Sequence, residues 1–260
     1  MFATRIFSPF KSSTLKLTQR VLQIHEDLST ARLALSTAST MHLLKPKSIH
    51  TTSVHSASTI GVIRPVGFIE RTLKKIGLLD VQKYRYMAIG NHVYEVVMAQ
   101  IDYPFFYKHF NMADTFFSWF LVTELHVWMI MVRYMAEGNA GKIVRNSVVS
   151  TLWQDTNARA ENLGKITEKL RNQQIKELSE QFHAALIGYD EGIQSDDKVL
   201  AGALWRRFFH LECNNPEHVE TLIIYVRKQI CLFDNLPSHE ILTKPALKLI
   251  DIKDVCKHQY

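Results

Sequence analysis

The feature that most constrains this 260-residue chain is one apolar run near its middle, "TFFSWFLVTELHVWMIMVRYM", which begins at residue 115. A helix of this length could cross a lipid bilayer. The run nevertheless contains Glu124, His126 and Arg133, and a charge near the centre of a bilayer costs about 2.5–3.5 kcal/mol even on insertion scales. We therefore predict that this run forms a helix buried at the centre of a globular fold.

Beyond residue 60, the rest of the chain shows helical periodicity interrupted by short turn signals. Apolar residues recur at helical steps over residues 68–76, 81–97, 143–153, 166–186, 199–208 and 219–233. Glycine and proline are sparse, with 10 and 7 residues, and the sequence lacks alternating segments bounded by hairpin turns. We predict an all-α protein: a single-domain helical bundle of about seven helices over residues 62–236, followed by a C-terminal tail, 237–260, of short mixed segments.

Two of the predicted helices carry a marked apolar stripe. In the helix over 81–97 the stripe comprises Val81, Tyr84, Met87 or Ala88, and further positions through Val97. In the helix over 166–186 it comprises Ile166, Leu170, Ile175, Leu178, Phe182 and Leu186, opposite a charged face. We expect both stripes to pack against the bundle.

Turn and cap residues predict where several helices begin and end. Asp114 is the expected N-cap of the central helix, and Gly138 suits the left-handed position after its end. Gly188 is expected to end the helix over 166–186, and Ser195 to cap the next one.

The first 60 residues differ in composition from the rest. They are rich in Ser and Thr and carry a net charge of +5 out of the chain's +6, which leaves +1 for the other 200 residues. A basic, acid-poor N-terminus without a continuous apolar segment is typical of a mitochondrial transit peptide; a disordered basic tail is the alternative. Because the body is close to neutral, its composition does not favour binding to DNA or other nucleic acid.

The stretch "GYDEGIQSDDKVLAGALWRRFF", residues 188–209, combines two glycines with two acidic pairs. Read as a calcium loop starting at Asp190, it places Gly192 and Ala201 where acidic ligands are required, so this interpretation fails. We predict a turn between two helices, in which Gly188 and Gly192 let the chain reverse and Asp190 and Glu191 are exposed.

Two interpretations of this turn stay open. It is a solvated acidic turn, or it forms a partner-docking surface with Trp205, Arg206 and Arg207, since Trp and Arg are favoured interface anchors. The start of the central helix is a second candidate surface, for a partner or a membrane interface, because its aromatic residues make it apolar around most of its circumference. The candidate partner-binding residues are Asp190, Glu191, Trp205, Arg206, Arg207, Phe116, Phe117 and Trp119.

Catalytic and metal-binding patterns find no support in the sequence. A di-iron bundle needs two Glu-x-x-His motifs, and the part beyond the leader offers one, Glu180 with His183. There is no nucleophile motif, phosphate-binding glycine loop or CxxC pair, and His126 is expected to be a hydrogen-bonded core residue. The sequence therefore predicts a protein that is not an enzyme, with no catalytic residue, cofactor or metal.

Four blocks of the chain, taken in order, resemble the ubiquinol–cytochrome c chaperone family. They are residues 114–138, "WQD" at 153–155, residues 188–209, and "YVRKQICLFDNL" at 225–236. The resemblance spans about residues 65–236. It implies a non-enzymatic assembly factor, without a cofactor, that helps to build mitochondrial complex III.

The same resemblance implies two protein partners, a small helical complex III assembly factor and newly synthesised cytochrome b, met near the mitoribosome. We accordingly expect a chaperone attached peripherally to the matrix side of the mitochondrial inner membrane, which covers an apolar segment of its client. Two alternatives stay open: a helical oxidoreductase with a di-iron or haem site, and an RNA-binding module of the mitoribosome.

Overall fold

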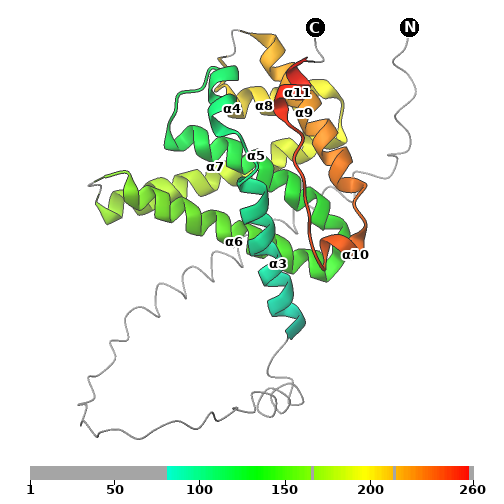
Figure 1. Ribbon diagram of the computed structural model, residues 1–260. Helices are drawn as coiled ribbons and strands as arrows, with labels where there is room; N and C mark the ends of the chain where they lie inside the picture. The colour runs from blue at the N-terminus through cyan, green and yellow to red at the C-terminus, as the bar shows by residue number, and fades with distance from the viewer. Residues whose placement is uncertain (1–80, 165–166, 213–214, 258–260) are drawn as a thin grey trace, which may run out of the picture.

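A computed structural model describes residues 81–164, 167–212 and 215–257 of the chain. Its elements are α3 (Val81–Met98), α4 (Tyr103–His109), α5 (Phe116–Tyr134), the 3-10 helix η1 (Met135–Glu137), α6 (Gly138–Asn162), α7 (Glu168–Gln194), α8 (Asp197–Phe208), α9 (Pro216–Asp234), α10 (Ser238–Ile241) and α11 (Ile252–Lys257) (Figure 1). These described ranges contain no strand, and the predicted all-α class is confirmed. The predicted transit peptide and the helix predicted over 68–76 lie outside the described residues.

Helix α5 forms the centre of the fold. Every residue from Ser118 to Met131 is buried, as expected for a helix that is apolar on all sides. In the described part of the chain, one helical stretch, Phe116–Asn162, is long and apolar enough for a membrane span, and 83% of its most apolar window is buried inside the fold. The predicted buried central helix is confirmed.

The ends of α5 differ in part from the prediction. Its N-cap is Thr115, whose hydroxyl oxygen accepts a hydrogen bond from the Ser118 amide at 3.2 Å, and not Asp114. Asp114 lies one residue too early, because a capping side chain bonds the amide two or three residues further on. Gly138 has a positive φ of 54°, but its ψ of −134° is not that of the predicted left-handed helical conformation, and it follows the short helix η1.

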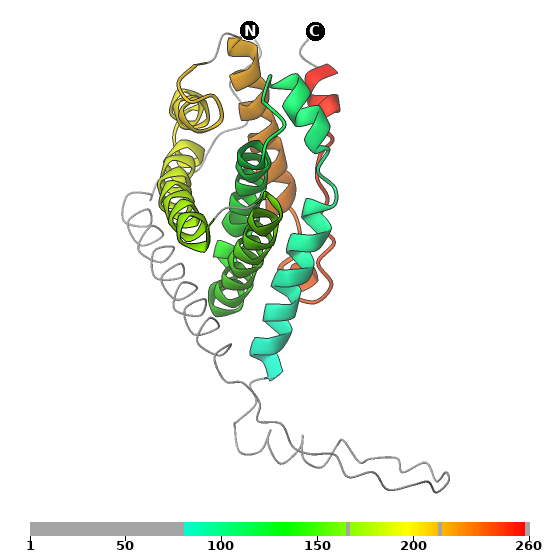
Figure 2. The same cartoon turned by 90° about the vertical axis from the view of Figure 1, so that its left-hand side faces the viewer.

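The helices form three layers, seen from the side in Figure 2. Helices α7 and α8 make one outer layer, α5, α6 and α9 the middle one, and α3 with the chain beyond α10 the other. Rings of α5 pack on rings of α7, with centroid distances of 5.1 Å for Trp128–Tyr189 and 6.3 Å for Phe120–Phe182. Aromatic packing therefore fixes α7 against the central helix.

Helix α3 packs on α6 with only part of its length. Ile89, Val93 and Val97 are buried there. The first turns of α3 project beyond the other helices (Figure 1), and Val81, Tyr84 and Met87 are exposed. The predicted packing of this part of the stripe is therefore wrong.

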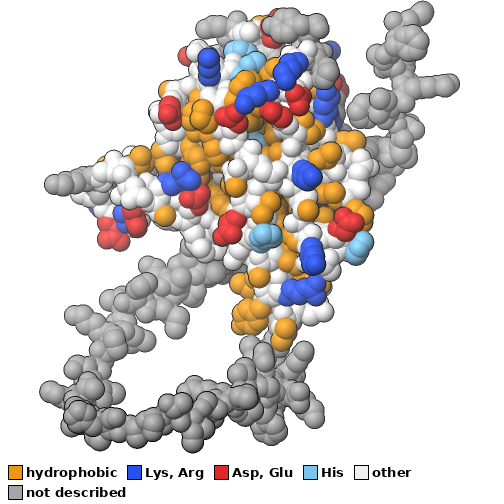
Figure 3. Space-filling model, in the orientation of Figure 1, with side chains coloured by type: hydrophobic (Ala, Val, Ile, Leu, Met, Phe, Trp, Pro, Cys, Tyr) orange, Lys and Arg blue, Asp and Glu red, His pale blue; other side chains and the backbone are white. Residues whose placement is uncertain are grey.

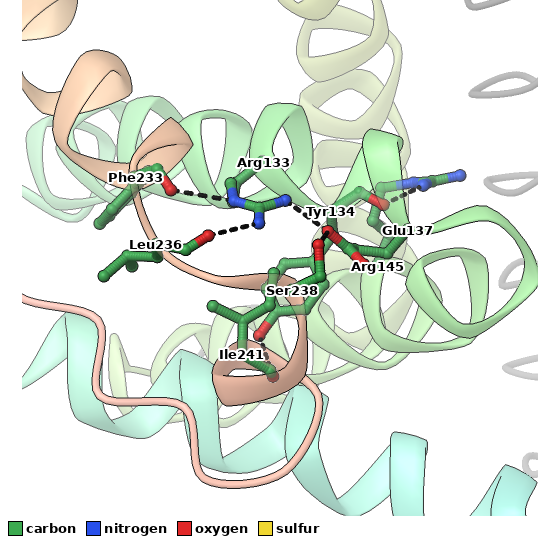
Figure 4. A network of polar contacts seen from close by, with 8 residues as sticks. All are labelled: Arg133, Tyr134, Glu137, Arg145, Phe233, Leu236, Ser238 and Ile241. Carbon is green, nitrogen blue, oxygen red and sulfur yellow. Dashed lines mark hydrogen bonds and ion pairs between the residues drawn. The ribbon is translucent and has the colours of Figure 1, made fainter.

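The C-terminal end of α5 is tied to the end of α9 and to the chain that follows it (Figure 4). Arg133 donates hydrogen bonds to the carbonyls of Phe233, at 2.9 Å, and Leu236, at 2.8 Å. The Tyr134 hydroxyl donates to the carbonyl of Ile241, at 2.9 Å. These hydrogen bonds hold the segment before residue 243 against the end of α5, so the C-terminal residues start from a defined position.

Residues 243–251, here called the strap, then cross the bundle without helical structure. Pro245 and Leu247 are buried, whereas Ala246 and Lys248 are exposed, which is the alternation of a β-strand. No neighbouring strand pairs with it in the described part of the chain. Two glutamine side chains supply the hydrogen bonds instead.

Each of these glutamines holds the strap backbone at two points. Gln100, two residues beyond the end of α3, donates to the Leu247 carbonyl at 3.0 Å and accepts from the Leu249 amide at 3.0 Å. Gln229 of α9 donates to the Lys248 carbonyl at 3.1 Å and accepts from the Ile250 amide at 2.7 Å. Residues of the predicted tail thus pack on the helical core, while the domain boundaries themselves stay predictions.

Candidate partner-binding surface

The start of α5 presents its aromatic side chains at different depths. Trp119 is only 6% exposed, and the guanidinium carbon of Arg159 lies 4.2 Å from its ring centroid. Phe116, whose ring centroid lies 5.6 Å from that of Trp119, and Phe117 are half-buried. Trp119 is therefore a core residue, contrary to the prediction, whereas Phe116 and Phe117 reach the surface.

Phe116 and Phe117 line an open groove of about 320 Å³ between the end of α6 and the first half of α7, here called the α6–α7 groove. Its other lining residues are Ala160, Leu163, Arg171, Gln174, Ile175, Glu177, Leu178 and Gln181. Among these, Ala160 and Leu178 are buried, while the polar residues Gln174, Glu177 and Gln181 are exposed. The groove therefore has an apolar floor and a polar rim.

The groove is open because the apolar stripe of α7 is longer than the surface that covers it. Leu178, Phe182 and Leu186 are buried, but Leu170, two turns before Leu178, is 45% exposed. Leu163, at the end of α6, is 54% exposed. Figure 1 shows the end of α6 and the start of α7 projecting from the body of the molecule. Apolar side chains on this projection have no complete cover within the described chain.

A second hollow, of about 550 Å³, lies on the other side of Phe117 and is here called the α5–α8 cleft. Its lining residues are Phe110, Asn111, Met112, Ala113, Thr115, Phe117, Ser118, Leu121, Phe208, Phe209, His210, Glu212, Asn215 and His218. The Phe117 ring stacks on His210, with centroids 5.5 Å apart, and lies 5.6 Å from the Arg207 guanidinium carbon. Phe117 thus separates the two hollows and is held from the α8 side.

Arg207 is itself held by a carboxylate of the central helix. Its Nη2 lies 2.6 Å from Oε2 of Glu124, and its Nε lies 2.8 Å from Oε1. Glu124 is fully buried, and burial raises the pKa of its carboxyl group, while the hydrogen bonds from Arg207 oppose this rise. Because its guanidinium is engaged inside the protein, Arg207 is not the exposed interface anchor that was predicted.

Asp190 also lies elsewhere than predicted. Helix α7 continues through Gly188 and Gly192, so Asp190 follows Leu186 by four residues and lies on the buried side of the helix. It is 6% exposed, and its Oδ1 accepts a hydrogen bond from Nε1 of Trp128 at 2.8 Å. The predicted exposure of Asp190 is therefore wrong.

The reversal of the chain occurs after Gln194 and not at the glycines. Ser195 ends α7, and Asp196, not Ser195, caps α8 by accepting a hydrogen bond from the Val199 amide at 3.1 Å. Gly192 has another role: a Cβ at this position would lie 2.7 Å from the Cα of Leu200. The glycine permits close contact between α7 and α8.

Three further predicted partner-binding residues, besides the half-buried Phe116 and Phe117, are exposed. Glu191 of α7 is exposed, as are Trp205, at 38%, and Arg206 of α8. These three residues stay candidates for contact with a partner.

The residues weighed for metal binding have other contacts. Nδ1 of His183 contacts the carbonyl of Ser179, and Glu180 lies 3.7 Å from the ammonium of Lys176. In residues 81–164, 167–212 and 215–257, no group of three or more His, Cys, Asp or Glu side chains could hold a metal ion.

His126 is a core residue, as predicted. Its Nδ1 donates to the Val122 carbonyl at 2.7 Å, and its Nε2 accepts from the Tyr225 hydroxyl at 2.8 Å. Burial lowers the pKa of His126 to about 4, although the bond to Val122 opposes this change. The imidazole is therefore neutral near pH 7 and joins α5 to α9.

Sequence reasoning did not find the groove itself. The periodicity predicts that Leu170 and Ile175 pack against the bundle, and it gives no indication that Leu163 lines a groove. One feature of the sequence does indicate the groove. The apolar stripe of α7 is long and begins before the part of α7 that faces α5. His210 in the cleft carried no signal, because its place depends on the turn after α8.

Comparison with known proteins gives several matches. A family model described as ubiquinol-cytochrome C chaperone matches residues 108–248, which include the groove. Ubiquinol-cytochrome c reductase complex assembly factor 1 of Drosophila melanogaster is 46% identical over 195 residues, 74% of this chain and 75% of the relative. The protein of the same name from Homo sapiens is 37% identical over 202 residues, 75% of this chain and 67% of the relative.

Two more distant proteins also match. Protein CBP3, mitochondrial, of Saccharomyces cerevisiae is 30% identical over 142 residues, 54% of this chain and 42% of that protein. The crystal structure of the Cbp3 homolog from Brucella abortus superposes with a TM-score of 0.58 at 20% identity, covering 72% of this chain and 98% of that one. The latter similarity concerns the fold.

Proposed function

This chain belongs to the ubiquinol–cytochrome c chaperone family, and from this premise we propose that it is a non-enzymatic assembly factor of mitochondrial complex III that covers an apolar segment of newly made cytochrome b. In this proposal the client binds in the α6–α7 groove. The work takes place on the matrix side of the inner membrane, near the mitoribosome, with the chaperone attached peripherally to the membrane.

The observation that carries the proposal is the uncovered apolar stripe of α7. A nascent membrane segment exposes apolar surface that aggregates in water, and a groove with an apolar floor and polar rim can cover such a segment. Leu163, which lines the groove, is 54% exposed, and Leu170, one residue before the lining residue Arg171, is 45% exposed. Both can contact a client without any rearrangement of the core.

A matched pair of substitutions tests this site in mitochondria. We expect Leu170→Asp to lower co-purification of newly made cytochrome b about tenfold or more, because losing one buried leucine contact costs about 1.5 kcal/mol or more. Leu232→Asp is the control, since Leu232 is exposed to a similar degree, 40%, on α9. Equal recovery of cytochrome b with both variants would exclude the groove as the client site.

We assign the small helical assembly factor to a different surface, formed by Glu191, Trp205 and Arg206. Trp and Arg side chains at the surface are favoured interface anchors. Trp205→Ala combined with Glu191→Lys is expected to lower recovery of this partner while the thermal unfolding of the protein stays unchanged. Undiminished recovery would remove this surface from the proposal.

A further inference from the structure

The first half of α3 carries apolar side chains that remain exposed instead of packing against the other described helices. Val81, Tyr84 and Met87 are 46%, 57% and 39% exposed, although they belong to a helix whose opposite side packs on α6. In the space-filling view, hydrophobic side chains lie beside Lys and Arg at the projecting end of α3 (Figure 3). This end therefore combines exposed apolar and basic groups.

From Arg85 onward, one residue after Tyr84, α3 and the strap enclose an open hollow of about 480 Å³. Its lining residues are Arg85, Ala88, Ile89 and His92 of α3 and Thr243, Lys244, Pro245 and Ala246 of the strap. Most of these side chains are apolar or small. Two basic side chains, Arg85 and Lys244, reach the same hollow from segments far apart in the sequence.

The two segments that line this hollow carry charge of one sign next to it. Helix α3 has no acidic residue before Glu95, and the strap has none before Asp251. Arg85, Lys244 and Lys248 are exposed on these two segments. Such a surface complements a ligand that combines negative charge with hydrocarbon, since cations attract the phosphate and the apolar side chains enter the hydrocarbon boundary.

We propose that Val81, Tyr84, Arg85, Met87 and Lys244 form a surface that docks on a bilayer containing anionic phospholipid. Tyrosine suits the boundary between headgroups and hydrocarbon, because its ring is apolar and its hydroxyl is polar. Each Lys or Arg near an anionic membrane contributes about 1 kcal/mol of binding free energy. This inference rests on the proposed function in one respect: a chaperone for a nascent membrane protein works beside the bilayer.

Vesicle flotation with the purified full chain, in the absence of any client, tests the docking surface. The chain is expected to float with vesicles of phosphatidylcholine mixed with phosphatidylglycerol and to remain unbound with phosphatidylcholine alone. Reversing two charges, in Arg85→Glu/Lys244→Glu, is expected to weaken binding about tenfold or more. Lys198→Glu/Lys228→Glu is the control, because it changes the net charge equally at exposed positions on α8 and α9.

The basic N-terminal residues are common to all variants, so differences between the variants report on this surface alone. Tyr84→Ser/Met87→Ser should weaken the part of the binding that survives high salt, since salt screens the contribution of the charges. Flotation with neither vesicle, or equal flotation of both charge-reversal variants, would overturn the proposal. A third outcome is that the chain does not float but self-associates, and that Tyr84→Ser/Met87→Ser abolishes the self-association. The surface would then bind a second copy of the chain, which also overturns the proposal.

Vesicle flotation and co-purification of cytochrome b test the two proposals independently. If Leu170→Asp retains cytochrome b while the charge-reversed protein loses vesicle binding, the groove assignment fails and the docking surface stands. If Leu170→Asp loses cytochrome b but the unaltered chain does not float, the reverse holds.

Discussion

Arg207 of α8 forms a two-point ion pair with Glu124 in the middle of α5, with N–O distances of 2.6 and 2.8 Å. The carboxylate is fully buried and the arginine side chain is 11% exposed. The same guanidinium lies over Phe117, which separates the two hollows at the start of α5. A single arginine thus links the stability of the core to the shape of the candidate client site.

Removing the arginine is expected to be strongly destabilising. Arg207→Met leaves the Glu124 carboxylate buried without its counter-charge, and the loss of one partner of a buried ion pair costs about 3–5 kcal/mol. Urea unfolding followed by circular dichroism measures the change in the free energy of unfolding.

The double variant Glu124→Leu/Arg207→Met separates charge from packing. Replacement of a buried ion pair by apolar side chains of similar volume is often close to neutral. We expect the double variant to be more stable than Arg207→Met alone. A double variant at least as unstable as the single one would show that packing around the arginine, and not the buried charge, dominates.

A pair of glycines on α7 gives a second prediction. Gly192→Ala is expected to cost about 1–3 kcal/mol, because its Cβ would lie 2.7 Å from the backbone of Leu200 and force α7 and α8 apart. Gly188→Ala places its Cβ 3.5 Å from Ala203, an ordinary contact, and gains up to about 1 kcal/mol of helix propensity. Thermal unfolding should therefore separate the two variants, and equal melting temperatures would refute the assignment of Gly192 to close helix packing.

These glycines also explain why the sequence did not locate Asp190. A glycine inside a helix costs only about 1 kcal/mol relative to alanine, which aromatic packing between α5 and α7 outweighs. Once the helix continues through Gly188, the four-residue step from Leu186 brings Asp190 to the buried side. The helical period alone places Asp190 on the buried side of α7. Gly188, interpreted as the end of the helix, led to the opposite prediction.

The class of the fold could be predicted because helical period and apolar content are local properties of the chain. The exposure of Leu170 and Tyr84 could not, since periodicity identifies an apolar face without showing whether another element covers it. The surface position of Phe116 and Phe117 could be predicted, because the aromatic residues at the start of α5 make more of its circumference apolar than one buried face requires. The strap was missed for a different reason: its backbone is held by side chains outside it, Gln100, which lies 149 residues before Leu249, and Gln229, which lies 21 residues before Ile250.

The buried His126 predicts how stability depends on pH. Its pKa is about 4 in the folded protein, against an ordinary value of 6.5, so between these values the unfolded chain binds a proton that the folded protein does not. Stability is therefore complete above about pH 6.5 and falls as the pH decreases through this window, by about 2 kcal/mol between about pH 7 and pH 5. Urea unfolding at a series of pH values measures this slope.

His126→Gln is the comparison for this slope, because glutamine is polar but does not titrate. His109 and His218 also have lowered pKa values, for which burial is the main cause, and both stay in the variant. We expect the variant to lose stability less steeply than the unaltered protein as the pH falls. Identical slopes would contradict the assignment of this pH dependence to His126.

The two glutamines that hold the strap predict a local change in hydrogen exchange. Gln229 is fully buried, and Gln229→Ala removes two hydrogen bonds to the strap, at a cost of about 1–3 kcal/mol. The Ile250 amide should then exchange faster, whereas Gln100→Ala should accelerate exchange of the Leu249 amide, with a smaller loss of stability because Gln100 is exposed. Hydrogen exchange resolved by NMR distinguishes these adjacent amides. If neither rate changes, burial of Leu247 holds the strap and the glutamine bonds contribute little.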